Sequence, residues 1–149
     1  LGLPEDTVLG VRYAGLVHDI GKLYIPAEIL SKPSKLTPAE YGLVKKHPEY
    51  GKDILSPLDF PWPLAEIILQ HHERIDGTGY PLGLKKEGIC IESRILSVAD
   101  TFDAMTSERP YRKKHSPAQA LEEIRSLSGK AYDPEIVEAL GKYCKENDF

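Results

Sequence analysis

Histidine and aspartate recur in four short segments of this chain, each beside a strongly apolar stretch. The segments read HDIGK, HPEYG, HHERIDGTGYP and VADTFDAM. A single adjacent His-Asp pair arises readily by chance, and a lone buried histidine is more often a hydrogen-bonded core residue than a metal ligand. The recurrence favours another interpretation, a metal site that a helical domain assembles from distant segments. Its candidate ligands are His18, Asp19, His47, His71, His72 and Asp100.

The candidate ligands offer nitrogen and oxygen atoms and no thiolate. Structural zinc sites favour cysteine, whereas imidazole combined with carboxylate is typical of catalytic metals. Iron, manganese or catalytic zinc therefore fits this set. Cys90 and Cys144 lie far apart in the sequence and show no C-x-x-C spacing, so we expect neither a disulfide nor a zinc knuckle.

The spacing of the ligands bears on how many ions they can hold. Neighbouring residues on a helix point about 100° apart, so we do not expect His71 and His72 to chelate one ion together. The alternatives are two metals, or one ligand and one supporting group. Asp19 suits a bridging position beside His18, and a pair of ions about 3.5–4 Å apart can hold a hydroxide for in-line attack on phosphorus. Lys22 would place a positive charge next to that phosphate.

Helical signals surround these segments. Thr37-Pro38-Ala39-Glu40 and Ser116-Pro117-Ala118-Gln119 are capping boxes with proline at the first helical position. Helices are also expected over residues 5–17, 63–73 and 93–106, and Asp133-Pro134 should open the last one. Apolar residues recur at helical spacing, as in the final stripe of Ile136, Val137, Leu140, Tyr143 and Cys144. Strand signals are sparse, so the predicted fold class is all-α.

Length and composition place limits on the function. The 149 residues are 41% hydrophobic and 28% charged, which is typical of one globular domain with a substantial core. No apolar run approaches the roughly 20 residues of a membrane span, and no signal-peptide pattern is present, so a cytoplasmic protein is expected. The net charge of −4 argues against general DNA binding.

Two further features of the sequence are a basic cluster and a glycine-rich loop. Arg109, Arg112, Lys113 and Lys114 form a basic cluster, which is either a solvated turn or a phosphate contact. The loop DGTGYPLGLKKEG is rich in glycine, and Gly77 and Gly79 permit backbone angles that other residues avoid.

Taken together, the motifs resemble the HD-GYP family of the HD-domain phosphohydrolases. HDIGK, IPAEIL, KLTPAEY, KHPEYG, HHERIDGTGYP, SRILSVADTFDAMTSERPYR and YDPEIV carry the resemblance, from about residue 13 to residue 137. The resemblance implies a helical bundle with a glycine-rich GYP loop. It also implies a centre of two or sometimes three divalent ions, iron or manganese. The implied activity is hydrolysis of cyclic di-GMP to pGpG and then GMP through a metal-bound hydroxide.

The same resemblance assigns roles to individual residues. Lys22 matches a lysine that assists at the phosphate, and Asp19 matches a ligand with a catalytic role. His18, Asp19, His47, His71, His72 and Asp100 match the metal ligands. Matches to substrate-binding positions are Tyr80, Asp103, Ala104, Arg109 and Arg112, although a helix-surface carboxylate is an equal alternative for Asp103. His115 matches no ligand and is expected at the surface.

One departure from the family pattern bears on the domain. Family members carry a further metal-ligating histidine, and some a glutamate, on a helix before HDIGK, whereas no histidine precedes His18 here. We therefore expect residues 1–149 to form a single HD-GYP domain without its first family helix or its upstream regulatory domain. That leaves two alternatives to the phosphodiesterase. One is a catalytically weak module that binds cyclic di-GMP or docks a diguanylate cyclase through the GYP loop, and the other is an HD phosphohydrolase of another nucleotide. A homodimer is left open.

Overall fold

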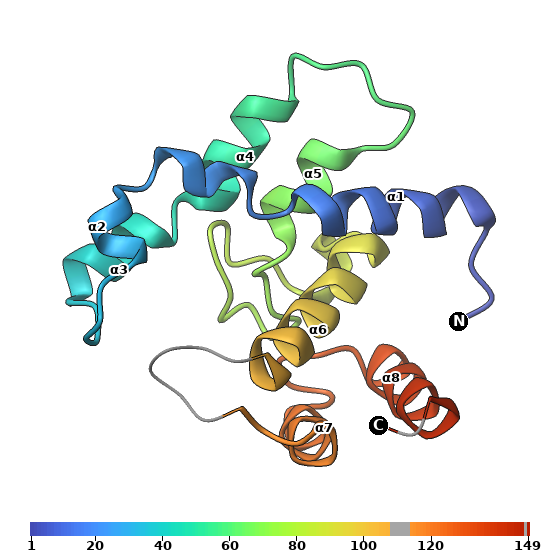
Figure 1. The fold of residues 1–149 in the computed structure, drawn as a ribbon. Coiled ribbons are helices and arrows are strands. Elements are labelled where there is room, and N and C mark those ends of the chain that lie inside the picture. The colour runs from blue at the N-terminus through green and yellow to red at the C-terminus, as the bar shows by residue number, and fades with distance from the viewer. Residues whose placement is uncertain (108–113, 148) are drawn as a thin grey trace.

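The computed structural model describes residues 1–107, 114–147 and 149, and its regular elements are all helical (Figure 1). Within those residues, β pairing is confined to two isolated bridges, Asp76 with Lys85 and Ser128 with Tyr132. The prediction of an all-α fold is therefore confirmed. The elements in chain order are α1 (Glu5–Val17), η1 (Ile20–Tyr24), α2 (Ala27–Leu30), α3 (Pro38–Val44), α4 (His47–Leu55), α5 (Leu64–Gln70), η2 (Lys86–Gly88), α6 (Ile91–Thr106), α7 (Pro117–Ser126) and α8 (Pro134–Glu146).

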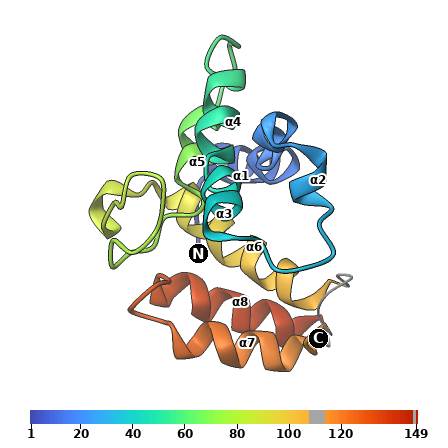
Figure 2. The ribbon, with the colours of Figure 1, turned by 90° about the vertical axis from the view of Figure 1, so that its left-hand side faces the viewer.

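Helix α6 lies between two hydrophobic clusters and joins the two halves of the bundle. Helices α1 and α5 pack on one side of α6, with α4 packed on α5, and α7 and α8 pack on the other side (Figure 2). Leu96 contributes to the first cluster and Val98 to the second. The first cluster contains Ala14, Leu55, Leu64, Ile67, Ile68 and Leu96; the second contains Val98, Met105, Ala120, Ile124, Tyr132, Ile136 and Val137.

Local sequence signals account for the starts of α3, α7 and α8. Both predicted capping boxes are present: the Thr37 hydroxyl accepts from the Glu40 N–H, and the Ser116 hydroxyl accepts from the Gln119 N–H. The Asp133 carboxylate accepts the Glu135 N–H at the start of α8. Each bond satisfies a backbone donor that a helix N-terminus leaves unpaired.

Two expectations about the helices were wrong in detail. The helix expected over 63–73 ends at Gln70, so the residues after it are not on the helix surface. Tyr143, expected in the apolar stripe of α8, is 52% exposed and stacks on Phe149 with ring centroids 5.8 Å apart. Its position on the rim of the stripe is more exposed than those of Ile136, Val137 and Cys144, which are buried.

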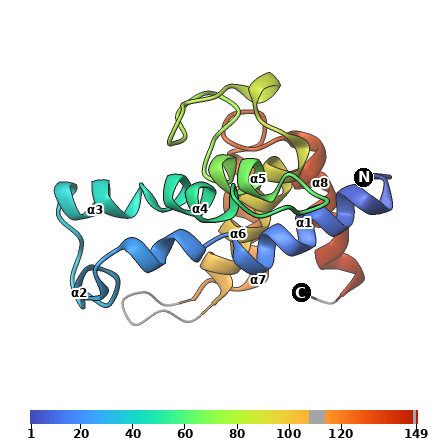
Figure 3. The same ribbon diagram turned by 90° about the horizontal axis from the view of Figure 1, so that it is seen from above.

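Gly21 brings the HDIGK segment into close contact with α4. A Cβ at this position would lie 1.9 Å from the His47 carbonyl oxygen and 2.5 Å from the Gly51 nitrogen. Both distances are far inside van der Waals contact, so only glycine allows η1 to pack this closely on α4. Seen from above, η1 and α1 run alongside α4 and α5 (Figure 3). The segment that carries Asp19 and Lys22 is thereby placed beside His47.

None of the described helices is both long and apolar enough to cross a membrane. Cys90 is partly buried, Cys144 is buried, and neither forms a disulfide, as expected from their spacing. Arg109 and Arg112, with Lys113, lie outside the described residues.

Candidate metal centre

Three of the predicted ligands are oriented by the same backbone interaction. The Nδ1 atoms of His18, His47 and His71 lie 2.7, 2.8 and 2.6 Å from the carbonyl oxygens of Gly15, Val44 and Ile68, respectively. Each carbonyl belongs to the residue three positions earlier. Because a carbonyl oxygen can only accept a hydrogen bond, Nδ1 carries the proton in each case. In a neutral ring, Nε2 then has a free lone pair and is the atom that can bind a metal.

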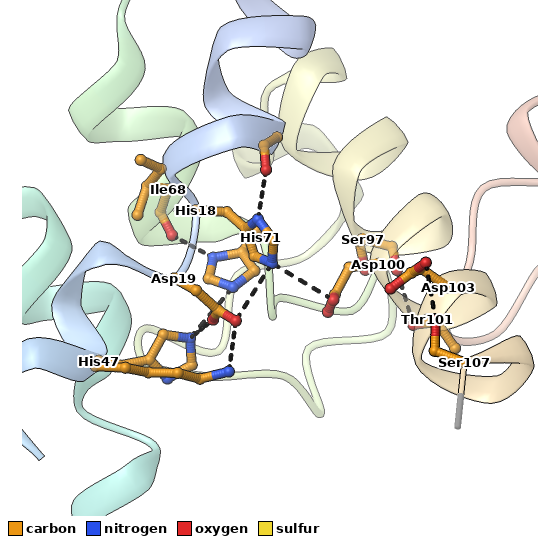
Figure 4. Close-up of polar contacts among 12 residues, drawn as sticks. His18, Asp19, His47, Ile68, His71, Ser97, Asp100, Thr101, Asp103 and Ser107 are labelled. Carbon is orange, nitrogen blue, oxygen red and sulfur yellow. Dashed lines mark hydrogen bonds and ion pairs between the residues drawn. The ribbon is translucent and has the colours of Figure 1, made fainter. Parts of the chain in front are cut away.

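The free nitrogens point toward one another. Nε2 of His47 lies 3.3 Å from Nε2 of His71, and the potential ligand atoms of His47, His71 and His72 all lie within 4.8 Å of one another. Figure 4 shows His18, His47 and His71 converging from three different elements. Helix α1 ends just before His18, α4 begins at His47, and α5 ends just before His71. Three helix ends therefore deliver the nitrogen ligands to one point.

Two carboxylates flank the histidines. Asp19 contacts both sides of the cluster, with one oxygen 3.6 Å from His18 Nε2 and the other 3.5 Å from His47 Nε2 (Figure 4). Asp100, from α6, lies 3.6 Å from the same His18 nitrogen. The two oxygens of Asp19 thus face different imidazoles, which is the arrangement that a bridging carboxylate requires.

Lys22 lies one helical turn beyond Asp19. Its Nζ is 2.6 Å from Oδ2 of Asp19, and its side chain is 37% exposed. The ammonium group is therefore held at the open edge of the cluster and remains accessible to an anionic ligand.

Burial keeps the inner imidazoles neutral. It lowers the pKa of His71 to about 4 and that of His72 to about 2, and the neighbouring histidines act in the same direction. Burial likewise lowers the pKa of His47. Neutral imidazole is the form that binds a metal, so these residues have the required protonation state at neutral pH.

His18 and Asp100, on the outer side of the cluster, shift each other's pKa in opposite directions. A hydrogen bond to Asp100, aided by the Gly15 carbonyl and the charge of Asp19, raises the pKa of His18 even though burial opposes this. Burial would raise the pKa of Asp100, but His18 and the other histidines lower it to about 2. Neutral nitrogen donors and ionised carboxylates together form a donor set suited to divalent transition metals.

The structure differs from the expectation for His71 and His72. Because α5 ends at Gln70, the angular spacing of an uninterrupted helix does not apply to them, and their ring centroids are only 4.0 Å apart with an interplanar angle of 39°. The two imidazoles can therefore approach the same metal together with His47.

Comparison with known proteins identifies the family. The HD domain profile matches residues 1–136. The chain belongs to the HD domain family. A cyclic di-GMP phosphodiesterase of Thermotoga maritima is 49% identical over 98% of this chain. A 3'3'-cGAMP-specific phosphodiesterase 2 of Vibrio cholerae is 38% identical over 97% of it. The chain spans 40% of the first relative's length and 28% of the second's.

Solved structures support the same HD domain fold. A cyclic GMP-AMP specific phosphodiesterase of V. cholerae superposes with a TM-score of 0.74, at 24% identity over 99% of this chain and 40% of that one. An HDG"Y"P protein from Bdellovibrio bacteriovorus gives a TM-score of 0.71, at 24% identity over 91% of this chain and 43% of that one. The resemblance to the HD-GYP branch of the HD domain family is therefore confirmed.

The GYP loop of this HD domain is held by a residue that sequence reasoning missed. Glu73 is 2% exposed, and its carboxylate accepts backbone N–H bonds from Leu82 (2.7 Å), Gly83 (3.1 Å) and Leu84 (2.9 Å). Its position directly after the two histidines and before the glycine-rich loop was the available signal. The three backbone hydrogen bonds hold residues 82–84 of the loop against the segment that carries His71 and His72.

Tyr80 is thereby placed on the cluster. Its ring stacks on His72 with centroids 4.8 Å apart and an interplanar angle of 27°, and Lys45 Nζ lies 4.7 Å from the Tyr80 ring centroid. Gly79 makes the approach possible, because a Cβ there would lie 2.4 Å from the Glu73 Cα. The predicted substrate residue Tyr80 therefore borders the candidate metal centre.

The other predicted residues lie further from the cluster or outside the described residues. Asp103 is exposed, one turn beyond Asp100 on α6, and accepts a hydrogen bond from the Ser107 hydroxyl at 3.2 Å (Figure 4). Ala104 is half-buried on the same helix. His115 is partly exposed and lies 3.5 Å from a carboxylate oxygen of Glu123, outside the cluster as expected. Arg109 and Arg112 lie outside the described residues.

Proposed function

We propose that this HD domain is a metal-dependent phosphodiesterase that hydrolyses cyclic di-GMP to pGpG and then to GMP. The observation that carries the proposal is the convergence of neutral histidine nitrogens on one point, flanked by Asp19 and Asp100. The relative from T. maritima, which bears the name of this activity, is 49% identical to the chain. Because the chain spans 40% of that relative, the substrate assignment rests on the domain alone.

The proposed cofactors are two or three divalent metal ions, and iron or manganese is the preferred metal. His18, His47, His71, His72, Asp19 and Asp100 would hold them. Divalent ions bound at such a centre lower the pKa of water and neutralise charge on a phosphodiester.

The chain's own residues orient the substrate. Lys22, held by Asp19 at the open edge, is placed to pair with a non-bridging phosphate oxygen as a point charge. Tyr80, stacked on His72 with Lys45 over its ring, would border a guanine base, and Asp103 and Ala104 would extend the same wall. Arg109 and Arg112 are proposed phosphate contacts, since guanidinium forks match phosphate oxygens.

Product analysis tests the proposal. Purified protein loaded with Fe²⁺ or Mn²⁺ under reducing conditions is incubated with cyclic di-GMP, and the nucleotides are separated by chromatography. We expect pGpG to appear first and GMP later, with no turnover in a His71→Ala variant. Nucleotide binding without turnover in either metal would instead identify a binding module.

A second candidate substrate is 3'3'-cGAMP. Relatives from V. cholerae that are named for this specificity are 38% and 41% identical to the chain. Parallel reactions with both cyclic dinucleotides at equal concentration would rank the two by kcat/KM. Docking of a diguanylate cyclase and formation of a homodimer stay predictions.

A further inference from the structure

A cavity of about 550 Å³ lies beside the metal centre, between η1 and α3. A second cavity of about 470 Å³ is lined by His18 and Asp19. Lys22 and Leu30 line both of them. The two cavities therefore adjoin at these residues, and a ligand group paired with Lys22 lies at the edge of the first cavity. Its volume lies within the range of small-molecule sites, about 300–1,000 Å³.

The lining of the first cavity combines an apolar wall with positive charge. Ile29, Leu30 and Leu36 supply apolar surface. Three lysines, Lys22, Lys32 and Lys35, line the same space, and no aspartate or glutamate is among its lining residues. An apolar wall beside ammonium groups matches the two parts of a nucleotide, its flat base and its phosphate.

The three lysines are not equivalent. Lys22 pairs with Asp19 at 2.6 Å. Lys32 donates to both carboxylate oxygens of Glu40 at 2.7 Å, and the same carboxylate accepts the Thr37 N–H in the capping box. Lys35 is exposed and has no carboxylate partner among the residues that the structure describes. Its charge is therefore the one left over for a ligand.

We propose that this cavity is a subsite for the half of a cyclic dinucleotide that is not cleaved, with the intact phosphodiester at Lys35 and the base against Leu30 and Leu36. The inference rests on the proposed function, because it assumes a substrate with two phosphodiesters. One phosphodiester is cleaved at the metal centre, and the other, with its nucleoside, needs a second place to bind. The two places adjoin at Lys22 and Leu30, which border both cavities.

The test separates binding of the second half from the chemistry at the first. Two substrates are compared: cyclic di-GMP, and bis(p-nitrophenyl) phosphate, which has a single phosphodiester and no nucleoside. In Lys35→Gln we expect KM for cyclic di-GMP to rise about three- to tenfold, the size of one partly exposed ion pair with phosphate. Lys35→Glu should raise it further, and kcat should stay within about twofold. Both variants should hydrolyse the small diester like the wild type.

A steric variant and a charge control complete the design. Ser34 is exposed and lines the cavity, so Ser34→Trp should fill it and raise KM for cyclic di-GMP alone. Lys145→Gln removes an exposed lysine from α8, a helix that contributes no residue to the lining of this cavity, and should leave KM for both substrates unchanged. If the wild type hydrolyses cyclic di-GMP but KM for it is unchanged in Lys35→Gln, Lys35→Glu and Ser34→Trp, the subsite is overturned and the proposed function is not. A wild type that hydrolyses only the small diester overturns the proposed function and the subsite with it.

Discussion

Nε2 of His47 lies 3.3 Å from Nε2 of His71, although the residues are 24 positions apart in the chain. Two protonated imidazoles at this separation would repel each other strongly. If only one ring were protonated, its Nε2 would donate a hydrogen bond to the Nε2 of the other ring. The pKa of His71, lowered to about 4 by burial, excludes the doubly charged state at neutral pH, and burial lowers the pKa of His47 as well. The Nε2 lone pairs of the two neutral rings then face each other in a buried, weakly screened space. Their repulsion is relieved when a cation lies between them.

Removal of Asp19 should separate metal binding from substrate binding. Asp19→Ala deletes the carboxylate that faces both His18 and His47, so we expect metal content and kcat to fall together, metal affinity by about a hundredfold. Arg109→Ala should instead raise KM with full metal content. Elemental analysis alongside steady-state kinetics checks both, and full metal occupancy in Asp19→Ala would overturn the bridging assignment.

Acid should destabilise the metal-free protein and weaken metal binding. The pKa of His71 falls from its ordinary 6.5 to about 4, so between these values the unfolded chain binds a proton at this residue that the folded chain does not. The free energy of unfolding therefore falls as pH drops from about 6.5 to about 4. His18, whose pKa is raised, has the opposite effect, but mainly above about pH 6.5, where its contribution to stability is lost as pH rises through its folded-state pKa.

Urea unfolding of the metal-free protein at a series of pH values measures this effect. The slope of the unfolding free energy against pH should be smaller in His71→Asn, which lacks the titrating group. Metal titrations over the same range should show weaker binding at low pH, because protons compete for the ligand nitrogens. An unfolding free energy that rises on acidification would contradict the assignment of neutral imidazoles.

Loss of the Glu73 carboxylate should release the GYP loop. Glu73→Ala leaves the N–H groups of Leu82, Gly83 and Leu84 without their acceptor, at a cost of about 2–4 kcal/mol if part of the loop rehydrates. Faster proteolysis within residues 77–84 and a lower unfolding free energy are the expected results. Glu87→Gln, an exposed residue of η2, is the matched control and should change neither quantity.

Two glycine substitutions should have opposite signs. Gly21→Ala places a Cβ against the His47 carbonyl, so η1 must move away from α4, at a cost of about 1–3 kcal/mol or more, and metal affinity should fall with it. Gly42 lies inside α3, and the space that a Cβ would occupy there is open, so Gly42→Ala should stabilise the protein by about 0.5–1 kcal/mol. Thermal unfolding of the two variants provides the comparison, and equal effects would contradict the close contact at Gly21.

Local signals in the sequence predicted the helices, whereas contacts between segments had to come from the structure. The capping boxes at Thr37 and Ser116 are complete within four residues, so they can be read directly from the sequence. The recurrence of histidine and aspartate, together with the motif resemblance, predicted that the histidines converge, but spacing alone does not say which helix ends meet. Glu73 was missed because its partners lie nine to eleven residues on, in a loop without periodicity.

The carbonyl bonds at His47 and His71 have a consequence for how metal is acquired. The Nδ1 atoms of His47 and His71 lie on the Val44 and Ile68 carbonyls. Burial lowers the pKa of His47 and lowers that of His71 to about 4, so both nitrogens that face the cluster are already deprotonated at neutral pH before an ion arrives. Uptake at neutral pH therefore releases no proton from these two ligands. The heat of metal binding that they contribute should then be the same in buffers of different ionisation enthalpy, and loading should proceed without a base to accept a proton from either ring.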